Sequence, residues 1–157
     1  MDLILWRHAE ARDGEGALAG SKLDMARELT VRGERQARRM AQWLDRQLVD
    51  TARVYTSPAV RAERTAHALN RKYKVTDELA PLATPQQLLS LAQWPEGKST
   101  VLLIGHQPTL GMTIARLLNL SDEQCAVRKG SLWWLRCKER EGSFHTQLMA
   151  VQAPDFL

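Results

Sequence analysis

The stretch Thr100-Val101-Leu102-Leu103-Ile104-Gly105-His106 decides the fold class. Residues 101–104 are apolar without interruption, and the run is too short for a helix. Such a run is typical of a parallel strand that is covered by helices on both faces. The stretch therefore predicts the central strand of an α/β sheet, followed directly by a glycine and a histidine.

Two other short runs have the same character. Residues 3–6 and 53–56 are each predicted to form a strand. Between them, Thr30 is expected to cap a helix that runs to about Gln47. Ser57-Pro58 is expected to open the helix after the second strand, with proline at its first position.

The second half of the chain continues the alternation of strands and helices. Thr84-Pro85 and Pro108 are predicted to open two further helices, and two late strands near 132–137 and 145–151 form a hairpin around Glu141-Gly142. The order of elements predicts an α/β fold: a single three-layer α/β/α domain over residues 1–157, with a mostly parallel central sheet.

Bulk composition is that of an ordinary globular domain. The 157 residues suit one domain, with 44% hydrophobic and 25% charged residues. No stretch approaches the roughly 18 apolar residues of a membrane span, and the N-terminus does not resemble a signal peptide, so we expect a cytoplasmic protein without a membrane partner. Two isolated cysteines and the lack of a carboxylate cluster predict no metal site and no cofactor.

Three chemically active residues follow three predicted elements. His8 follows the first strand, Arg61 lies in the first turn of the helix after the second strand, and His106 follows the central strand. Ligands of open α/β sheets bind beyond the carboxyl ends of the strands. We therefore expect Arg7, His8, Arg61 and His106 on one rim of the sheet.

The expected rim suits an anion. Helix N-termini at Ser57-Pro58 and Gln107-Pro108 direct N–H groups and positive dipole ends toward it. The planar guanidinium of arginine matches phosphate oxygens in a bidentate way. The net charge of +4 also favours anionic partners. A phosphate-binding pocket is the resulting prediction.

The same residues lie in segments that resemble the motifs of the histidine phosphatase superfamily, which has the phosphoglycerate mutase-like fold. Leu5–Ala11 resembles its Arg-His-Gly segment, and Thr56–Ala66 resembles its Ser-Pro-x-x-Arg-x-x-x-Thr-Ala motif. Gly105-His106-Gln107-Pro108 resembles the third motif, and its proline points to the SixA-type phosphohistidine phosphatases. Arg27–Gly33 is similar to an Arg-x-Leu-Thr-x-x-Gly segment of that branch.

The resemblance implies a metal-independent phosphatase. In that family the residue at His8 attacks phosphorus and forms a phosphohistidine, which water then hydrolyses. Arg7, Arg61 and His106 are expected to bind the phosphoryl oxygens. The charge of the arginines, and that of His106 if its ring is protonated, could replace the charge that a metal supplies elsewhere.

Two departures from the family pattern matter. Ala9 replaces the glycine after His8, which requires ordinary backbone there because alanine resists a positive φ. Only about 40 residues separate Thr65 from His106, which leaves no room for the inserted segment that covers the substrate and supplies a general acid in the mutases. Glu78 is the nearest candidate for that acid, and a surface carboxylate is the alternative.

Other residues near the expected rim have weaker assignments. Arg27 and Gln107 are candidates for substrate binding, and the glycine-containing loop 12–24 is a candidate partial lid. The helix with Arg32, Arg35, Arg38 and Arg39 could be a basic patch for RNA or an acidic partner. We favour a solvated face, and expect no nucleic-acid partner, because Glu28 and Glu34 interrupt the positive charges.

Three functions compete at this point. An open site with weak acid assistance favours a phosphohistidine of a phosphotransfer protein, whose P–N bond is labile. A phosphatase for small phosphomonoesters is the close alternative. A non-catalytic module that binds phosphate or nucleic acid is the third, although a pure binder needs no nucleophile. A monomer is the expected state of the chain.

Overall fold

The computed structural model describes all 157 residues and centres on a six-stranded sheet of order β3-β2-β4-β1-β5-β6. The strands are β1 (Asp2–Arg7), β2 (Arg53–Thr56), β3 (Lys74–Val75), β4 (Val101–Gly105), β5 (Leu132–Arg140) and β6 (Ser143–Gln152). The first four in sequence are parallel to one another, whereas β5 is antiparallel to β1 and β6 is antiparallel to β5. The sheet is thus mixed. The parallel strands β1 and β4 end directly before His8 and His106.

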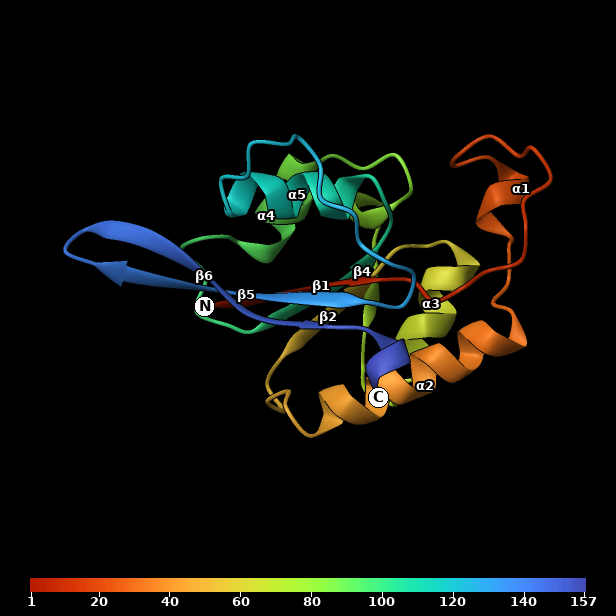
Figure 1. Ribbon diagram of the computed structural model, residues 1–157, viewed down its shortest axis with the longest axis horizontal. Helices are drawn as coiled ribbons and strands as arrows, with labels where there is room; N and C mark the ends of the chain where they lie inside the picture. The colour runs from red at the N-terminus through yellow and green to blue at the C-terminus, as the bar shows by residue number, and fades with distance from the viewer.

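Helices cover both faces of the sheet (Figure 1). The helices α2 (Val31–Asp45) and α3 (Val60–His67) pack on one face, and α4 (Pro85–Ala92) and α5 (Thr109–Leu117) pack on the other. Alternate residues of β1 serve the two cores, with Ile4 and Trp6 toward α2 and α3 and Leu3 and Leu5 toward α4 and α5. This confirms the three-layer α/β/α architecture.

The strand β4 lies inside the sheet, as its apolar run predicts. It pairs in parallel with β1 on one side and with β2 on the other, and all five of its residues are buried. Full burial of a Leu or Ile side chain contributes roughly 1.5–3 kcal/mol relative to exposure. The run therefore stabilises both cores while it positions the glycine and histidine at its end.

The helix starts confirm most of the predicted caps. The Thr30 hydroxyl accepts from the Gly33 N–H at 2.9 Å at the start of α2. Thr84 and Gln87 form a capping box at α4, with Pro85 in its first turn. The helix α5 begins at Thr109, directly after Pro108.

The start of α3 was wrongly predicted. The helix begins at Val60, not at Pro58, and its N-cap residue Ala59 makes no side-chain cap. The Ser57 hydroxyl accepts from the Ala59 N–H at 3.1 Å and lies 2.7 Å from a ring nitrogen of His106. Ser57 therefore serves the rim of the sheet and not the helix.

Smaller elements complete the fold. The β5–β6 hairpin turns at Glu141-Gly142, as predicted, and projects beyond the rest of the sheet (Figure 1). A short helix, α1 (Lys22–Met25), ends the loop predicted over residues 12–24, and the 3₁₀ turns are η1 (Asp77–Leu79) and η2 (Pro154–Phe156). None of the helices combines the length and the apolar character that crossing a membrane requires. The cytoplasmic location stays a prediction.

Candidate active site

A pocket of about 240 Å³ opens at the carboxyl ends of the parallel strands. Arg7 pairs with Gly105 in the β1–β4 register, which sets the two following histidines side by side with ring centroids 5.1 Å apart. Six predicted residues line this pocket: Arg7, His8, Arg27, Arg61, His106 and Gln107. The expected convergence on one rim is therefore present in the structure.

His8 is buried and held in one tautomer. Its Nδ1 lies 2.8 Å from the carbonyl oxygen of Ala9, which only accepts, so Nδ1 carries the proton. Arg61 Nε donates to His8 Nε2 at 3.4 Å, so Nε2 presents a lone pair. Burial, and then the electrostatic influence of His106 and the charges of Arg61 and Arg7, hold the pKa of His8 well below 6.5. His8 is thus a neutral imidazole with an available nitrogen.

Arg61 is almost fully buried and is oriented by Asp24 of α1. Arg61 Nη1 donates to the Asp24 carbonyl oxygen at 2.7 Å, and Nη2 lies 3.3 Å from the Asp24 carboxylate. The Gly20 N–H and Arg27 Nε also donate to this carboxylate. Burial alone would raise the pKa of Asp24, but these donors outweigh burial and hold it below its usual value. The ion pair fixes Arg61 in the pocket wall.

His106 is neutral in this site, so it does not add the positive charge that a protonated ring would supply. Arg61 Nη2 donates to His106 Nδ1 at 3.3 Å, so the ring proton lies on Nε2, which donates to the Ser57 hydroxyl at 2.7 Å. Burial and the charge of Arg61 lower the pKa of His106 to about 3. The positive charge of the pocket therefore comes from its arginines and a lysine.

That lysine is Lys129, in the segment before β5. The Gly130 N–H donates to the His8 carbonyl oxygen at 3.0 Å, and Trp6 Nε1 donates to the Gly130 carbonyl at 2.8 Å, so this segment is fixed to β1. Gly130 has φ +75°, a conformation that favours glycine. Lys129 lines the pocket beside Arg7, whose pKa is lowered by burial and by the charge of Arg61. This excess of positive charge favours an anion.

Comparison with known proteins agrees with this geometry. The sequence profile of the histidine phosphatase superfamily (branch 1) matches residues 3–82. The chain belongs to the histidine phosphatase superfamily. It is 34% identical over 125 residues to the phosphohistidine phosphatase SixA of Escherichia coli strain K12, covering 74% of each chain. It is 30% identical over 132 residues to a SixA homologue of Haemophilus influenzae, covering 74% of this chain and 77% of that protein.

Solved histidine phosphatases share the whole fold. A structure of the protein histidine phosphatase SixA complexed with tungstate superposes with a TM-score of 0.77, at 27% identity and over 99% of both chains. The putative SixA of Agrobacterium tumefaciens superposes with a TM-score of 0.78 over 98% of this chain. This chain is accordingly an enzyme of the SixA type with the phosphoglycerate mutase-like fold and phosphatase activity.

The alanine that replaces the family glycine after His8 fits without strain. Ala9 is not among the residues with positive φ, which confirms the ordinary backbone that alanine requires. Its N–H donates to the Thr65 hydroxyl at 3.0 Å, and that hydroxyl donates to the Arg61 carbonyl at 2.7 Å. The threonine of the second histidine phosphatase motif thus ties His8 to the helix that carries Arg61.

Glu78 lies outside this histidine phosphatase site. It is fully exposed on η1 and lines a separate depression beside the first turn of α4. A hydrogen bond from the Thr76 hydroxyl lowers the pKa of its carboxyl group, which keeps it ionised. Both its position and its charge argue against Glu78 as a proton donor.

The weaker candidates, Gln107 and Arg27, line the pocket but also have structural contacts. Gln107 Nε2 donates to the Cys125 carbonyl at 2.9 Å, and its Oε1 accepts from the Gly111 N–H at 2.7 Å. Arg27 Nη1 donates to the Arg12 carbonyl at 3.0 Å. Both residues therefore also hold the walls of the pocket in place.

Sequence reasoning missed Asp24 and Lys129. Ser21-Lys22-Leu23-Asp24 has the Ser-x-x-Asp pattern that marks a helix start, and the Ser21 hydroxyl does accept from the Asp24 N–H. That pattern could have located α1, although it does not show that Asp24 reaches Arg61. No local pattern marks Lys129.

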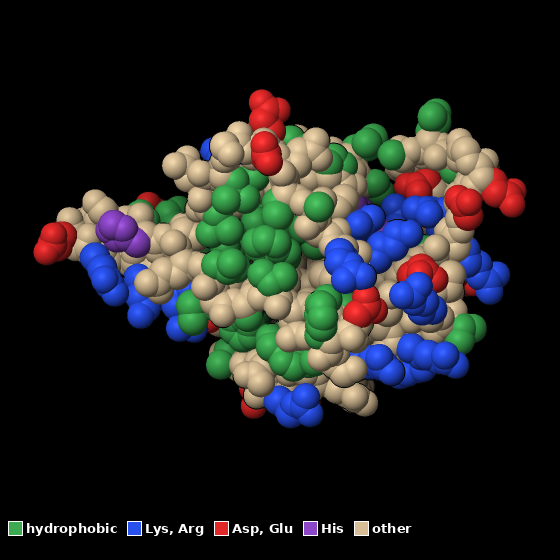
Figure 2. All heavy atoms as spheres, in the orientation of Figure 1, with side chains coloured by type: hydrophobic (Ala, Val, Ile, Leu, Met, Phe, Trp, Pro, Cys, Tyr) green, Lys and Arg blue, Asp and Glu red, His purple; other side chains and the backbone are tan.

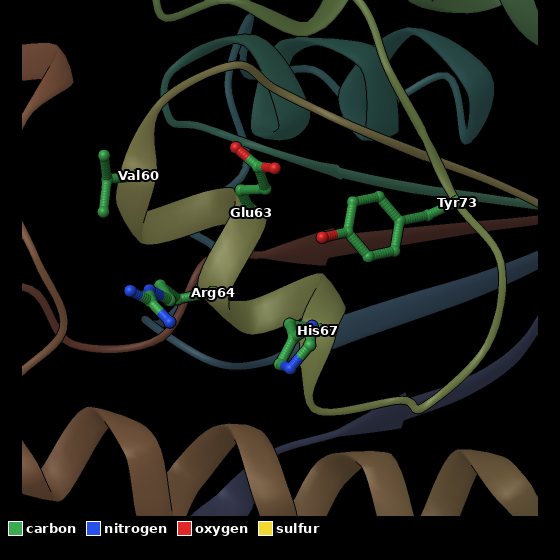
Figure 3. A pocket seen from close by; sticks show the side chains of 5 residues that line it. All are labelled: Val60, Glu63, Arg64, His67 and Tyr73. Atoms are coloured by element: carbon green, nitrogen blue, oxygen red, sulfur yellow. The ribbon is translucent and has the colours of Figure 1, made fainter.

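A second depression, of about 230 Å³, lies on the outer face of α3 (Figure 3). Its lining side chains are Val60, Glu63, Arg64 and His67, which share one face of α3, and Tyr73 opposite them. Arg61 belongs to the other, buried face of the same helix. This depression is therefore separate from the histidine phosphatase pocket. No group of three or more His, Cys, Asp and Glu side chains in the structure is arranged to hold a metal ion.

Proposed function

We propose that the chain is a phosphatase that removes the phosphoryl group from a phosphohistidine of a phosphotransfer protein, through a covalent phospho-His8 intermediate and without a metal. The observation that carries the proposal is the state of His8. It is neutral, its proton is held on Nδ1 by Ala9, and its Nε2 presents a lone pair in a pocket with excess positive charge. A nucleophile must be unprotonated to attack phosphorus.

The two chemical steps follow from this arrangement. His8 Nε2 forms a bond to phosphorus while the bond from phosphorus to the leaving nitrogen breaks, and the substrate imidazole departs with a proton from solvent. A water molecule then attacks phospho-His8, which releases inorganic phosphate and restores the neutral ring. Arg7 and Arg61 offset the negative charge of the phosphoryl oxygens in both steps.

The substrate class rests on the shortage of acid groups. Asp24 is the one carboxylate that lines the pocket, and it is bound by Arg61 and Arg27. With no free carboxylic acid to protonate a poor leaving group, the site favours a substrate whose bond to phosphorus is already labile. Phosphohistidine has such a bond once its imidazole is protonated.

The relatives support the same proposal. The proteins of Escherichia coli and Haemophilus influenzae that match three quarters of this chain carry the name phosphohistidine phosphatase SixA or its homologue. The SixA structure that superposes on this chain was complexed with tungstate, a tetrahedral oxyanion with the shape of phosphate.

A comparison of substrates tests the proposal. Purified protein would be assayed for phosphate release from a carrier protein phosphorylated on histidine and from a panel of sugar phosphates and nucleotides. We expect kcat/KM to be much higher for the carrier protein. Faster turnover of a small phosphomonoester would instead assign the site to that class.

A further inference from the structure

The helix α2 exposes a row of arginines toward solvent. Their spacing of three, four and seven residues places them on one side of the helix. The row, here called the basic stripe, consists of Arg32, Arg35 and Arg39 of α2 and Arg46, the residue that follows its last turn. Because each helical residue turns by about 100°, Glu34 and Asp45 project to a different flank. Glu34, one of the two acidic residues expected to interrupt these charges, therefore leaves the stripe continuous, and the other, Glu28, precedes the helix.

The stripe begins beside the active site. Arg32 Nη1 lies 3.5 Å from the carboxylate of Glu10, which is only two residues after His8. Gln36, in the same half of α2, accepts from the Glu10 N–H at 2.9 Å. A Cβ atom placed on Gly130 would lie 3.4 Å from Gln36 Oε1, so the segment with Lys129 packs against this half of the helix.

Lys129 at the pocket therefore follows directly on the half of α2 where the stripe begins. Figure 2 shows Lys and Arg side chains gathered over α2 and the neighbouring loops, with a smaller group on the distant hairpin. The opening of the pocket and the exposed side of α2 together present a basic surface to an approaching partner.

Most of these charges lack an acidic partner. Arg32 is the one member of the stripe that makes an ion pair, whereas Arg35, Arg39 and Arg46 make none, and neither does Lys129. A row of unpaired like charges repels itself, and an acidic surface placed against it would relieve that repulsion.

We propose that the basic stripe and Lys129 form a docking surface for an acidic face of the phosphorylated protein, oriented so that its phosphohistidine enters the pocket. This inference rests on the proposed function. A folded substrate large enough to present a histidine side chain to the pocket covers the adjoining half of α2 at the same time. Complementary charge of this kind chiefly raises the rate of encounter and sets orientation.

Charge reversal on α2 tests the docking surface. The double variant R35E/R39E changes two exposed residues outside the pocket, and K138E/R140E makes the same charge change on the exposed end of the hairpin. The KM and kcat of each variant would be measured with the phosphohistidine carrier protein and with an aryl phosphate, at low and at high salt.

We expect R35E/R39E to raise the KM for the carrier protein by about tenfold or more at low salt and to weaken its salt dependence. Its kcat and its turnover of aryl phosphate should stay unchanged, and the hairpin variant should behave as the wild type. An unchanged KM, or an equal change in both variants, would overturn the docking surface.

Two further outcomes distinguish a failure of the docking surface from a failure of the proposed function. If the wild type hydrolyses aryl phosphate but not the carrier, the proposed substrate is wrong and its docking surface with it. Fluorescence anisotropy with single-stranded RNA provides the other comparison. Binding of RNA that is lost in R35E/R39E, while the KM for the carrier stays the same, would assign the stripe to nucleic acid and contradict the proposal.

Discussion

Asp24 binds Arg61 twice, through its carbonyl oxygen at 2.7 Å from Nη1 and its carboxylate at 3.3 Å from Nη2. Both side chains are less than a tenth exposed. A guanidinium held at two nitrogens has little rotational freedom, so its third nitrogen, Nε, points its N–H group at His8 in a fixed direction. A four-residue helix thereby orients a group at the bottom of the pocket.

Replacing Asp24 with Asn should lower kcat/KM by about 100-fold, because misplacing a positioning group by an ångström has an effect of that order. The Asn side chain keeps a carbonyl acceptor but loses the charge that pairs with Arg61. Steady-state kinetics with a small phosphate ester would measure the loss. The control is Asp155→Asn, which removes the exposed partner of Arg128 and should leave the rate unchanged. Wild-type kinetics in Asp24→Asn would contradict the role given to the ion pair.

Replacing Gly33 with Ala should destabilise the protein, although alanine normally favours a helix. A Cβ atom on Gly33 would lie 1.9 Å from the carbonyl oxygen of Glu10, so α2 or the segment after His8 has to move. Such overpacking costs about 1–3 kcal/mol. Urea unfolding would measure it, with Gly105→Ala as the control because its nearest neighbour would be 3.6 Å away. A more stable Gly33→Ala variant would show that the two segments are not in contact.

Acid should weaken the fold through its two buried histidines. The pKa of His106 is about 3 and that of His8 is also well below 6.5, whereas both groups titrate near 6.5 in the unfolded chain. Below about pH 6.5 the unfolded chain binds more protons, so stability falls with falling pH, by up to about 1.4 kcal/mol per pH unit for each histidine.

The variant His106→Asn removes one of the two histidines that take up a proton when the protein unfolds in acid. Urea unfolding at about pH 7 and about pH 5 should show a slope that is shallower than in the wild type by roughly 1 kcal/mol per pH unit. His67→Asn, at an exposed position of α3, is the matched control for the loss of a histidine side chain. Equal slopes in the wild type and His106→Asn would mean that His106 is not buried in its neutral form.

The parallel strands β1, β2 and β4 and the four rim residues could be predicted from sequence for one physical reason, whereas the two-residue parallel strand β3 was not predicted. The apolar runs that became β1 and β4 are local signals, and the carboxyl ends of neighbouring parallel strands meet at one edge. His8 and His106 therefore had to lie near each other once the two strands paired. Arg61 joined them because α3 starts at the end of β2.

The remaining parts of the site depend on contacts between distant segments. Asp24 reaches Arg61 from the short helix α1, and Lys129 reaches the pocket because Gly130 bonds to the His8 carbonyl. Neither contact corresponds to a recognisable pattern within a short stretch of the sequence. The start of α3 was misplaced for a similar reason, since Ser57 bonds to His106 from a different strand end. The row of arginines on α2 is hard to recognise in the sequence because charges that are neighbours in sequence lie on different flanks of the helix, and its role as a docking surface stays a proposal.

The most direct test of the account is to trap the phosphoenzyme. Purified protein would be incubated briefly with a carrier protein labelled on phosphohistidine, with excess chelator, alongside a His8→Ala variant whose thermal unfolding confirms that it folds. The account predicts a label on the wild type that is stable in base and labile in acid, unaffected by chelator, and absent from His8→Ala. Hydrolysis by the wild type without any such label, or a label retained by His8→Ala, would contradict His8 as the nucleophile.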